Sequence, residues 1–136
     1  MKRLLLAIVL VLMLPVLATA QTWHTANQAT IAWNAVAPIA TGDTIKYQLY
    51  TRTDTTSAGT AVGTEVTGTQ SLVTFNTEGR YYIGVEVIRY PQGETVGIKS
   101  ATKGWSNIAA DCAAAGPFGI VFYVAPPAPA GLRNVP

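Results

Sequence analysis

The sequence predicts an all-β fold, a sandwich of antiparallel strands. Charged residues make up only 12% of the chain, and no stretch after the first 20 residues shows a sustained helical period. The clearest segment is residues 79–90, GRYYIGVEVIRY, in which the odd-numbered residues from Tyr81 to Val87 are apolar or aromatic and share one face. This alternation is typical of a half-buried strand. We therefore expect a central strand here, with Tyr82 and Glu86 on its outward face.

The N-terminal segment, residues 1–20, has the pattern of a secretory signal peptide. Lys2 and Arg3 precede an apolar run, and Ala-Thr-Ala stands before Gln21, which is the usual order of such a signal and its cleavage site. A retained membrane anchor is the weaker interpretation, because the run is shorter than the roughly 20 residues that span a bilayer and Pro15 interrupts it. We expect a secreted chain, extracellular or periplasmic, without membrane contact after cleavage.

The remaining chain is expected to form one domain, residues 21–124, followed by a Pro-rich tail, residues 125–136. This length suits a single two-layer core. The formal net charge of the whole chain is +2, and Lys2 and Arg3 account for it, so the mature chain is close to neutral. A nucleic-acid partner therefore lacks electrostatic support.

Five further strands are expected from alternating patterns or from apolar runs between turns. They are residues 29–36, 44–52, 60–66, 71–75 and 118–124. The segment between the central strand and the last one includes IAADCAAAGP, residues 108–117, which we expect to be a loop or a brief helix.

Four aromatic residues, in this order along the strands, carry a family resemblance. Trp33 lies on an early strand, Tyr47 on the next, and Phe75 stands six residues before Tyr81. With these residues, residues 29–124 resemble a fibronectin type III domain. The resemblance implies an immunoglobulin-like sandwich of about seven antiparallel strands. It also implies that the hydroxyl of Tyr81 bonds back to the turn before its strand.

The two ends of this region differ from the family pattern. The Trp-Ser-Asn at Trp105 resembles the approach to the last strand of bacterial members, but only about a dozen mature residues precede Trp33. We therefore expect the first strand to be short or missing. The tail, APPAPAGLRNVP, resembles the linker and first strand of a following domain, so the chain carries an A-like strand at its C-terminus.

Three fates are open for this tail. It could fold back and fill the vacant edge of its own sandwich, or cross to the edge of a neighbouring subunit by strand addition. It could also be a disordered Pro-rich end. Strand donation between identical copies would propagate into a filament unless it closed a ring. Leu132 would be the inserted side chain, and the residues of the partner strand are Gly131, Leu132, Arg133 and Val135.

The sequence contains no recognisable catalytic or metal-binding pattern. His24 lies far along the chain from Cys112 and has no nearby acidic residue, so a Cys/His or Ser/His/Asp arrangement has little to build on. The carboxylates are dispersed and no metal-ligand cluster occurs. Cys112 lies among alanines, without a cation to activate its thiolate, and is expected to be an inert free thiol or, alternatively, to pair with another molecule. We expect no enzyme activity, no cofactor and no metal.

Aromatic side chains offer one alternative binding surface. If Tyr82 and Tyr90 face outward and Trp105 or Trp23 lies near them, they would form a platform on which a sugar ring could stack. The other interpretation is that they are scattered surface residues and that Trp105 packs against the sandwich.

From the sequence we therefore expect a secreted, noncatalytic structural or protein-interaction module. Its partner would be itself, in a homo-oligomer or filament joined by the C-terminal strand, or another cell-surface protein. The alternative is a monomeric surface binding module for a glycan or another protein.

Overall fold

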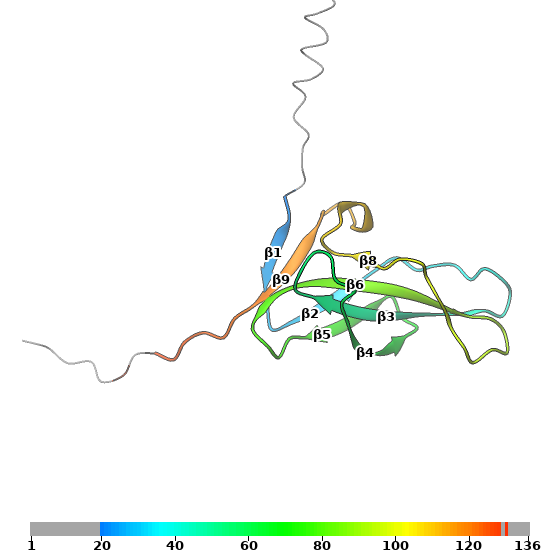
Figure 1. Cartoon of the computed structure of the whole chain (residues 1–136), viewed down its shortest axis with the longest axis horizontal. Helices are drawn as coiled ribbons and strands as arrows, with labels where there is room; N and C mark the ends of the chain where they lie inside the picture. Colours follow the sequence, from blue (N-terminus) through cyan, green and yellow to red (C-terminus); the bar gives the residue numbers. More distant parts are fainter. Residues whose placement is uncertain (1–19, 129, 131–136) are drawn as a thin grey trace, which may run out of the picture.

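The computed structural model describes residues 20–128 and 130, and over these the chain is all-β (Figure 1). It forms nine strands and one short 3-10 helix, η1 (Ala109–Asp111). The strands are β1 (Thr22–Thr25), β2 (Gln28–Ala32), β3 (Thr44–Arg52), β4 (Thr60–Val66), β5 (Gln70–Thr74), β6 (Gly79–Tyr90), β7 (Ile98–Lys99), β8 (Gly104–Trp105) and β9 (Phe118–Phe122). The bounds expected for β3, β4 and β6 are confirmed, and η1 lies in the expected loop.

Strand β6 is the centre of the larger sheet, whose order is β1-β9-β6-β3-β4. One edge of β6 pairs with the whole of β3, from Thr44 opposite Tyr90 to Arg52 opposite Tyr82. The other edge pairs in turn with β7, β8 and β9. These three short strands form one interrupted partner of β6, and the loop that contains η1 lies between β8 and β9.

The smaller sheet consists of β2 and β5, which are antiparallel. Its inner face contributes Ile31, Val73 and Phe75 to the core, and the larger sheet contributes Leu49, Ile83 and Ile120. These six buried side chains form one cluster, so the two sheets pack across a single apolar core. This is the layered arrangement of a β-sandwich.

The N-terminal strand β1 pairs in parallel, whereas only antiparallel strands were expected. The first strand is short rather than missing, because β1 has four residues, and it pairs in parallel with β9, Thr22 opposite Phe118. The sheets are therefore mixed and contain more strands than the about seven antiparallel ones that the family pattern implied. A four-residue strand gives too little alternation to recognise, and its partner lies at the other end of the domain.

Strand β6 was expected to be half buried, and this expectation is wrong. Gly84, Glu86 and Ile88, which lie on the supposed outward face, are all buried, and Glu86 is only 6% exposed. Tyr50 of β3, which lies opposite Gly84, is only 9% exposed. The physical reason is that residues 97–105 fold beside and over β6, so that the outer face of the sheet is covered as well.

No helix within residues 20–128 is both long enough and apolar enough to span a membrane. The proposed signal peptide, apart from Ala20, lies outside the described residues, and so do the four residues of the expected partner strand.

Candidate functional site

The outer edge of β2 is unpaired in the part of the chain that the structure describes. Two hydrogen bonds bracket the β2–β5 ladder, from Trp33 N to Thr69 O at 2.9 Å and from Phe75 N to Asn27 O at 2.8 Å. The backbone N–H and C=O groups of successive residues in an antiparallel strand point alternately to its two edges. Those of the odd-numbered residues of β2 therefore point toward β5. The N–H and C=O groups that face the open edge belong to Gln28, Thr30 and Ala32. Such an edge is a template for an added strand.

A groove of about 460 Å³ lies between the two sheets on this side of β2. Its wall on the smaller sheet includes Ile31 and Trp33, and its floor on the larger sheet includes Ile83 and Val85. The far wall is formed by Trp105 of β8 and the residues around Cys112, together with Phe118. The open edge therefore borders an apolar gap in the sandwich. The outer edge of β5 is also unpaired, but no residue of β5 lines this groove.

Trp33, which lines the groove, contains a buried polar atom that lacks a partner in the described part of the chain. Its ring packs against Tyr47 with a centroid distance of 5.3 Å, while the Tyr47 hydroxyl accepts a hydrogen bond from Val36 N at 2.8 Å. The indole Nε1 of Trp33 is buried and has no hydrogen-bond partner among the described residues. A buried N–H without an acceptor costs about 1–3 kcal/mol.

The ring of Trp105 lies on the outer face of the larger sheet and is packed on several sides. Only 7% of the residue is exposed, and the ring lies against the backbone of Gly84, where a Cβ atom would stand 2.7 Å from it. Gly59 makes a similarly close approach, at 2.6 Å, with a φ of +75° that favours glycine. The guanidinium carbon of Arg52 lies 3.8 Å from the ring centroid.

Arg52 also ties two loops to this ring. Its Nη2 donates to Asn107 Oδ1 at 2.8 Å and its Nη1 donates to Ser57 O at 3.0 Å. The planar fork of arginine can stack and donate at the same time. Trp105 is therefore held in place by the loop before β4 and by the loop that contains η1.

The thiol of Cys112 lies at the groove and is partly shielded from solvent. The Sγ atom donates to Ser106 O at 3.3 Å, and the residue is half-buried. Burial, and then the neighbouring Asp111 carboxylate, raise the pKa of the thiol. Cys112 is therefore a protonated, weakly nucleophilic thiol at neutral pH.

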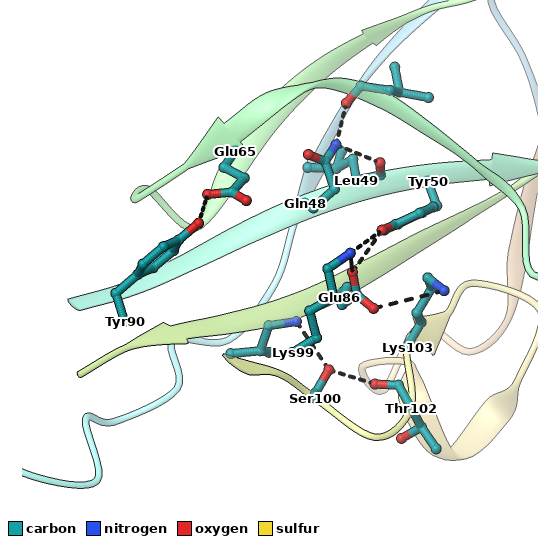
Figure 2. Close-up of polar contacts among 12 residues, drawn as sticks. Gln48, Leu49, Tyr50, Glu65, Glu86, Tyr90, Lys99, Ser100, Thr102 and Lys103 are labelled. Atoms are coloured by element: carbon teal, nitrogen blue, oxygen red, sulfur yellow. Dashed lines mark hydrogen bonds and ion pairs between the residues drawn. The ribbon is translucent and has the colours of Figure 1, made fainter. Parts of the chain in front are cut away.

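A charge cluster on the outer face of the larger sheet surrounds Glu86 (Figure 2). Glu86 accepts a hydrogen bond from the Tyr50 hydroxyl at 2.7 Å and pairs with Lys99 at 3.1 Å and Lys103 at 3.9 Å. Burial raises the pKa of Glu86, but the hydrogen bonds from Tyr50 and Lys99 outweigh it and hold the pKa below its ordinary value. The hydrogen bond to Glu86 raises the pKa values of Tyr50 and Lys99. The cluster fastens the segment that contains β7 and β8 to β6 and β3.

The three aromatic residues of the expected binding platform do not come together. Tyr82 packs against Trp23, with centroids 5.4 Å apart. Tyr90, at the other end of β6, donates to Glu65 at 2.8 Å (Figure 2). The Nζ atom of Lys46 lies 4.7 Å from the centroid of the Tyr90 ring. Trp105 is buried beneath Arg52. Eight residues of strand separate Tyr82 from Tyr90, which is on the order of 27 Å.

The four residues that carry the family resemblance form two aromatic pairs. Trp33 contacts Tyr47, and Phe75 lies 4.8 Å from Tyr81 between ring centroids. The hydroxyl of Tyr81 donates to Thr77 O at 2.6 Å, so the expected bond to the preceding turn is confirmed. His24, on β1, contacts the edge of Phe118 at 6.3 Å.

Arg52 was missed by the sequence reasoning, which expected a vacant edge but did not assign it to β2. Arg52 is the last residue of a recognisable strand, and an arginine at such a place resembles any surface cation. The position of its partner, Trp105, depends on a pairing with Gly84 that no local pattern reveals. An arginine at the end of a strand rich in aromatic residues could have suggested that its guanidinium stacks on an aromatic ring.

Within residues 20–128 and 130, no three side chains of His, Cys, Asp or Glu are grouped in a way that could hold a metal ion. No protein-family model, curated protein or solved structure matches this chain. The class that the fold itself defines is an all-β protein of two sheets packed around one core.

Proposed function

We propose that this chain is a secreted, noncatalytic structural or protein-interaction module with an immunoglobulin-like sandwich of the fibronectin type III kind. The order of strands, the packing of two sheets and the hydrogen bond from Tyr81 to Thr77 O support this assignment. The signal-like segment, residues 1–20, supports export. Mass spectrometry of the exported protein should find Gln21 at its N-terminus.

Within this class, the module assembles with other copies of itself through its C-terminal strand. The observation that carries this proposal is the unpaired edge of β2 beside an apolar groove. An exposed edge of this kind is costly to leave empty, because it invites uncontrolled pairing. A strand supplied by another copy would cover the edge and bury apolar side chains at the same time.

The test compares the chain of residues 21–136 with a version that ends at Ala125. The shorter version keeps every described strand, and also the hydrogen bond from Val124 N to Glu78 Oε1. Light scattering and negative-stain microscopy should show rods or ladders for the longer chain and monomers for the shorter one. Monomers of equal stability in both cases would refute assembly through the tail. A longer chain that is monomeric but more stable would mean that the tail closes its own sandwich.

The glycan-binding alternative is less well supported. Its expected platform of Tyr82, Tyr90 and Trp105 does not form one surface. Binding to a glycan array by the version ending at Ala125, with loss of binding on changing Tyr82 or Trp23 to Ala, would favour this alternative over assembly.

A further inference from the structure

We infer that the acceptor for the donated strand is the groove between β2 and β8, and that residues 131–135 of a second copy pair along β2 with Leu132 in the groove. This inference rests on the proposed function, because it assigns the site at which assembly takes place. It identifies the partner as another copy of this chain and makes residues of β2, β6 and β8 the binding surface.

The open edge of β2 has backbone groups available for a new strand. Gln28, Thr30 and Ala32 direct their N–H and C=O groups away from β5, so a new strand can form a ladder with them without breaking a bond that already exists. The outer edge of β5 offers a similar ladder. The edge of β2, however, borders the groove, whereas no residue of β5 lines it.

The groove beside β2 is apolar and could receive the inward side chains of an added strand. A strand added to a sheet directs alternate side chains toward the core, so the inward side chains of the new strand would continue the layer that contains Ile31 and Val73. They would enter the groove of about 460 Å³, which Val85 and Phe118 help to line. Leu132 is the largest apolar residue of the segment GLRNV, residues 131–135. Its side chain is therefore the one that we place in the apolar groove.

The path of the chain favours a second copy over the same copy. Thr25 of β1 lies opposite Val121 of β9, and β2 begins three residues after Thr25. The end of β9 and the start of β2 are therefore at the same end of the sandwich, and the chain after β9 leads away from the sheets there (Figure 1).

The linker between β9 and the donated strand is stiff. Residues 125–130 read APPAPA, and a Pro-rich segment of this kind extends about 3.1 Å per residue, which gives a reach on the order of 20 Å. Pairing with its own β2 would require the linker to reverse direction within this segment, whereas pairing with a neighbour requires only extension. Each copy offers one groove and one tail, so the contact is head-to-tail.

The native Cys112 makes a direct test possible, since it lies at the groove. The donor is the full mature chain with Leu132→Cys and Cys112→Ser, and the acceptor is the wild-type sequence ending at Ala125. Neither can polymerise with itself through a bond between positions 112 and 132. After mild oxidation of the mixture, we expect a covalent one-to-one dimer in which mass spectrometry finds the disulfide between positions 132 and 112.

The matched control donor carries Arg133→Cys with Cys112→Ser. Adjacent residues of a strand point to opposite faces, and a disulfide requires Cα atoms roughly 4.4–6.8 Å apart. This control should give much less of the cross-linked dimer. Equal cross-linking by both donors would overturn the assignment, because it would indicate random collision. A chain with Leu132→Cys and native Cys112 that forms only an internal bridge would overturn donation between copies.

A second pair of variants tests the edge itself. Thr30 and Leu72 face one another in the β2–β5 ladder without exchanging hydrogen bonds, so Thr30→Pro and Leu72→Pro each remove an N–H from one outer edge of the same sheet. Thr30→Pro should abolish assembly of the full-length chain, and Leu72→Pro should leave it intact. The reverse result would place the donated strand on β5 and overturn the assignment. Unchanged far-ultraviolet circular dichroism shows that each variant is folded.

The two proposals fail in different ways. If the unmodified mature chain remains monomeric, the proposed assembly is wrong. If it forms rods that survive Thr30→Pro and that yield no bond between positions 132 and 112, assembly is real but the groove is not its site.

Discussion

The guanidinium carbon of Arg52 lies 3.8 Å from the centroid of the Trp105 ring, and both residues are 7% exposed. This stack joins the end of β3 to β8 on the outer face of the larger sheet. A desolvated cation over an indole ring is worth up to about 2 kcal/mol. The pair is thus a structural contact that holds β8, and β8 lines the groove of the proposed acceptor site.

The first prediction concerns this stack. Arg52→Lys keeps the charge but loses the planar fork that donates to Asn107 and Ser57. We expect the free energy of unfolding, measured in urea, to fall by about 1–2 kcal/mol. The control is Arg80→Lys, since Arg80 is exposed and lies 5.2 Å from the Trp23 ring. A loss in the control as large as in Arg52→Lys would show that the buried stack has no special role.

The second prediction concerns the close approach of Trp105 to β6. Gly84→Ala would place a Cβ atom 2.7 Å from the ring, which forces the indole away from its position. Overpacking of this kind typically costs about 1–3 kcal/mol, and a shift in tryptophan fluorescence should accompany the loss in the urea midpoint. In Gly104→Ala the new Cβ would meet only Asp111 Cβ, at 3.9 Å. That variant should be close to wild type, and equal effects in both would contradict the packing argument.

The third prediction concerns the corner before β6. Tyr81→Phe removes the hydroxyl that donates to Thr77 O at 2.6 Å and keeps the ring that packs against Phe75. The loss of one such hydrogen bond should lower the free energy of unfolding by about 1 kcal/mol. Tyr123→Phe is the control, because Tyr123 is 58% exposed. If thermal unfolding curves of the two variants coincide, the corner does not stabilise the fold.

The fourth prediction concerns pH. The pKa of Glu86 is held below its ordinary value of 4.5, so its contribution to stability is present above that value and is lost as the pH falls through the lower folded pKa. The pKa of Lys99 is raised above 10.5 by its hydrogen bond to Glu86, so that contribution is complete below 10.5 and is lost as the pH rises through the raised pKa. Stability should therefore decline at both extremes.

Glu86→Gln tests this dependence. The variant should be less stable at neutral pH by about 1–3 kcal/mol, since hydrogen bonds to a charged group are lost, and both slopes should become shallower in urea titrations across pH. Glu94→Gln, at an exposed position, should leave the slopes unchanged. Wild-type slopes in Glu86→Gln would mean that other groups govern the pH response.

The strands that the sequence predicts best are those with long, regular alternation. The bounds of β3 and β6 follow from their alternating residues, because a period of two is a local property that survives without knowledge of the partner strand. The hydrogen bond of Tyr81 was expected from the resemblance to fibronectin type III domains alone, and it reaches a carbonyl four residues away.

The features that the sequence could not predict depend on distant pairings. The burial of Glu86 results from Lys99 and Lys103, which lie on or next to two-residue strands without any periodicity. Strand β1 was missed because its four residues pair with a strand more than ninety positions away. The groove follows from the absence of a third strand beside β2 in the described structure, which is a property of the whole fold and not of any segment.

The parallel pairing of β1 with β9 has a mechanical consequence. The chain enters the domain at the start of β1 and leaves it at the end of β9, and the two strands run in the same direction. A pull on the two ends therefore loads this ladder in shear, so that its hydrogen bonds are stretched together rather than opened one after another. Force spectroscopy through the two ends should show a single rupture peak, and several small steps would contradict this. A string of such modules would carry tension along its length through the strands that connect each copy to the next.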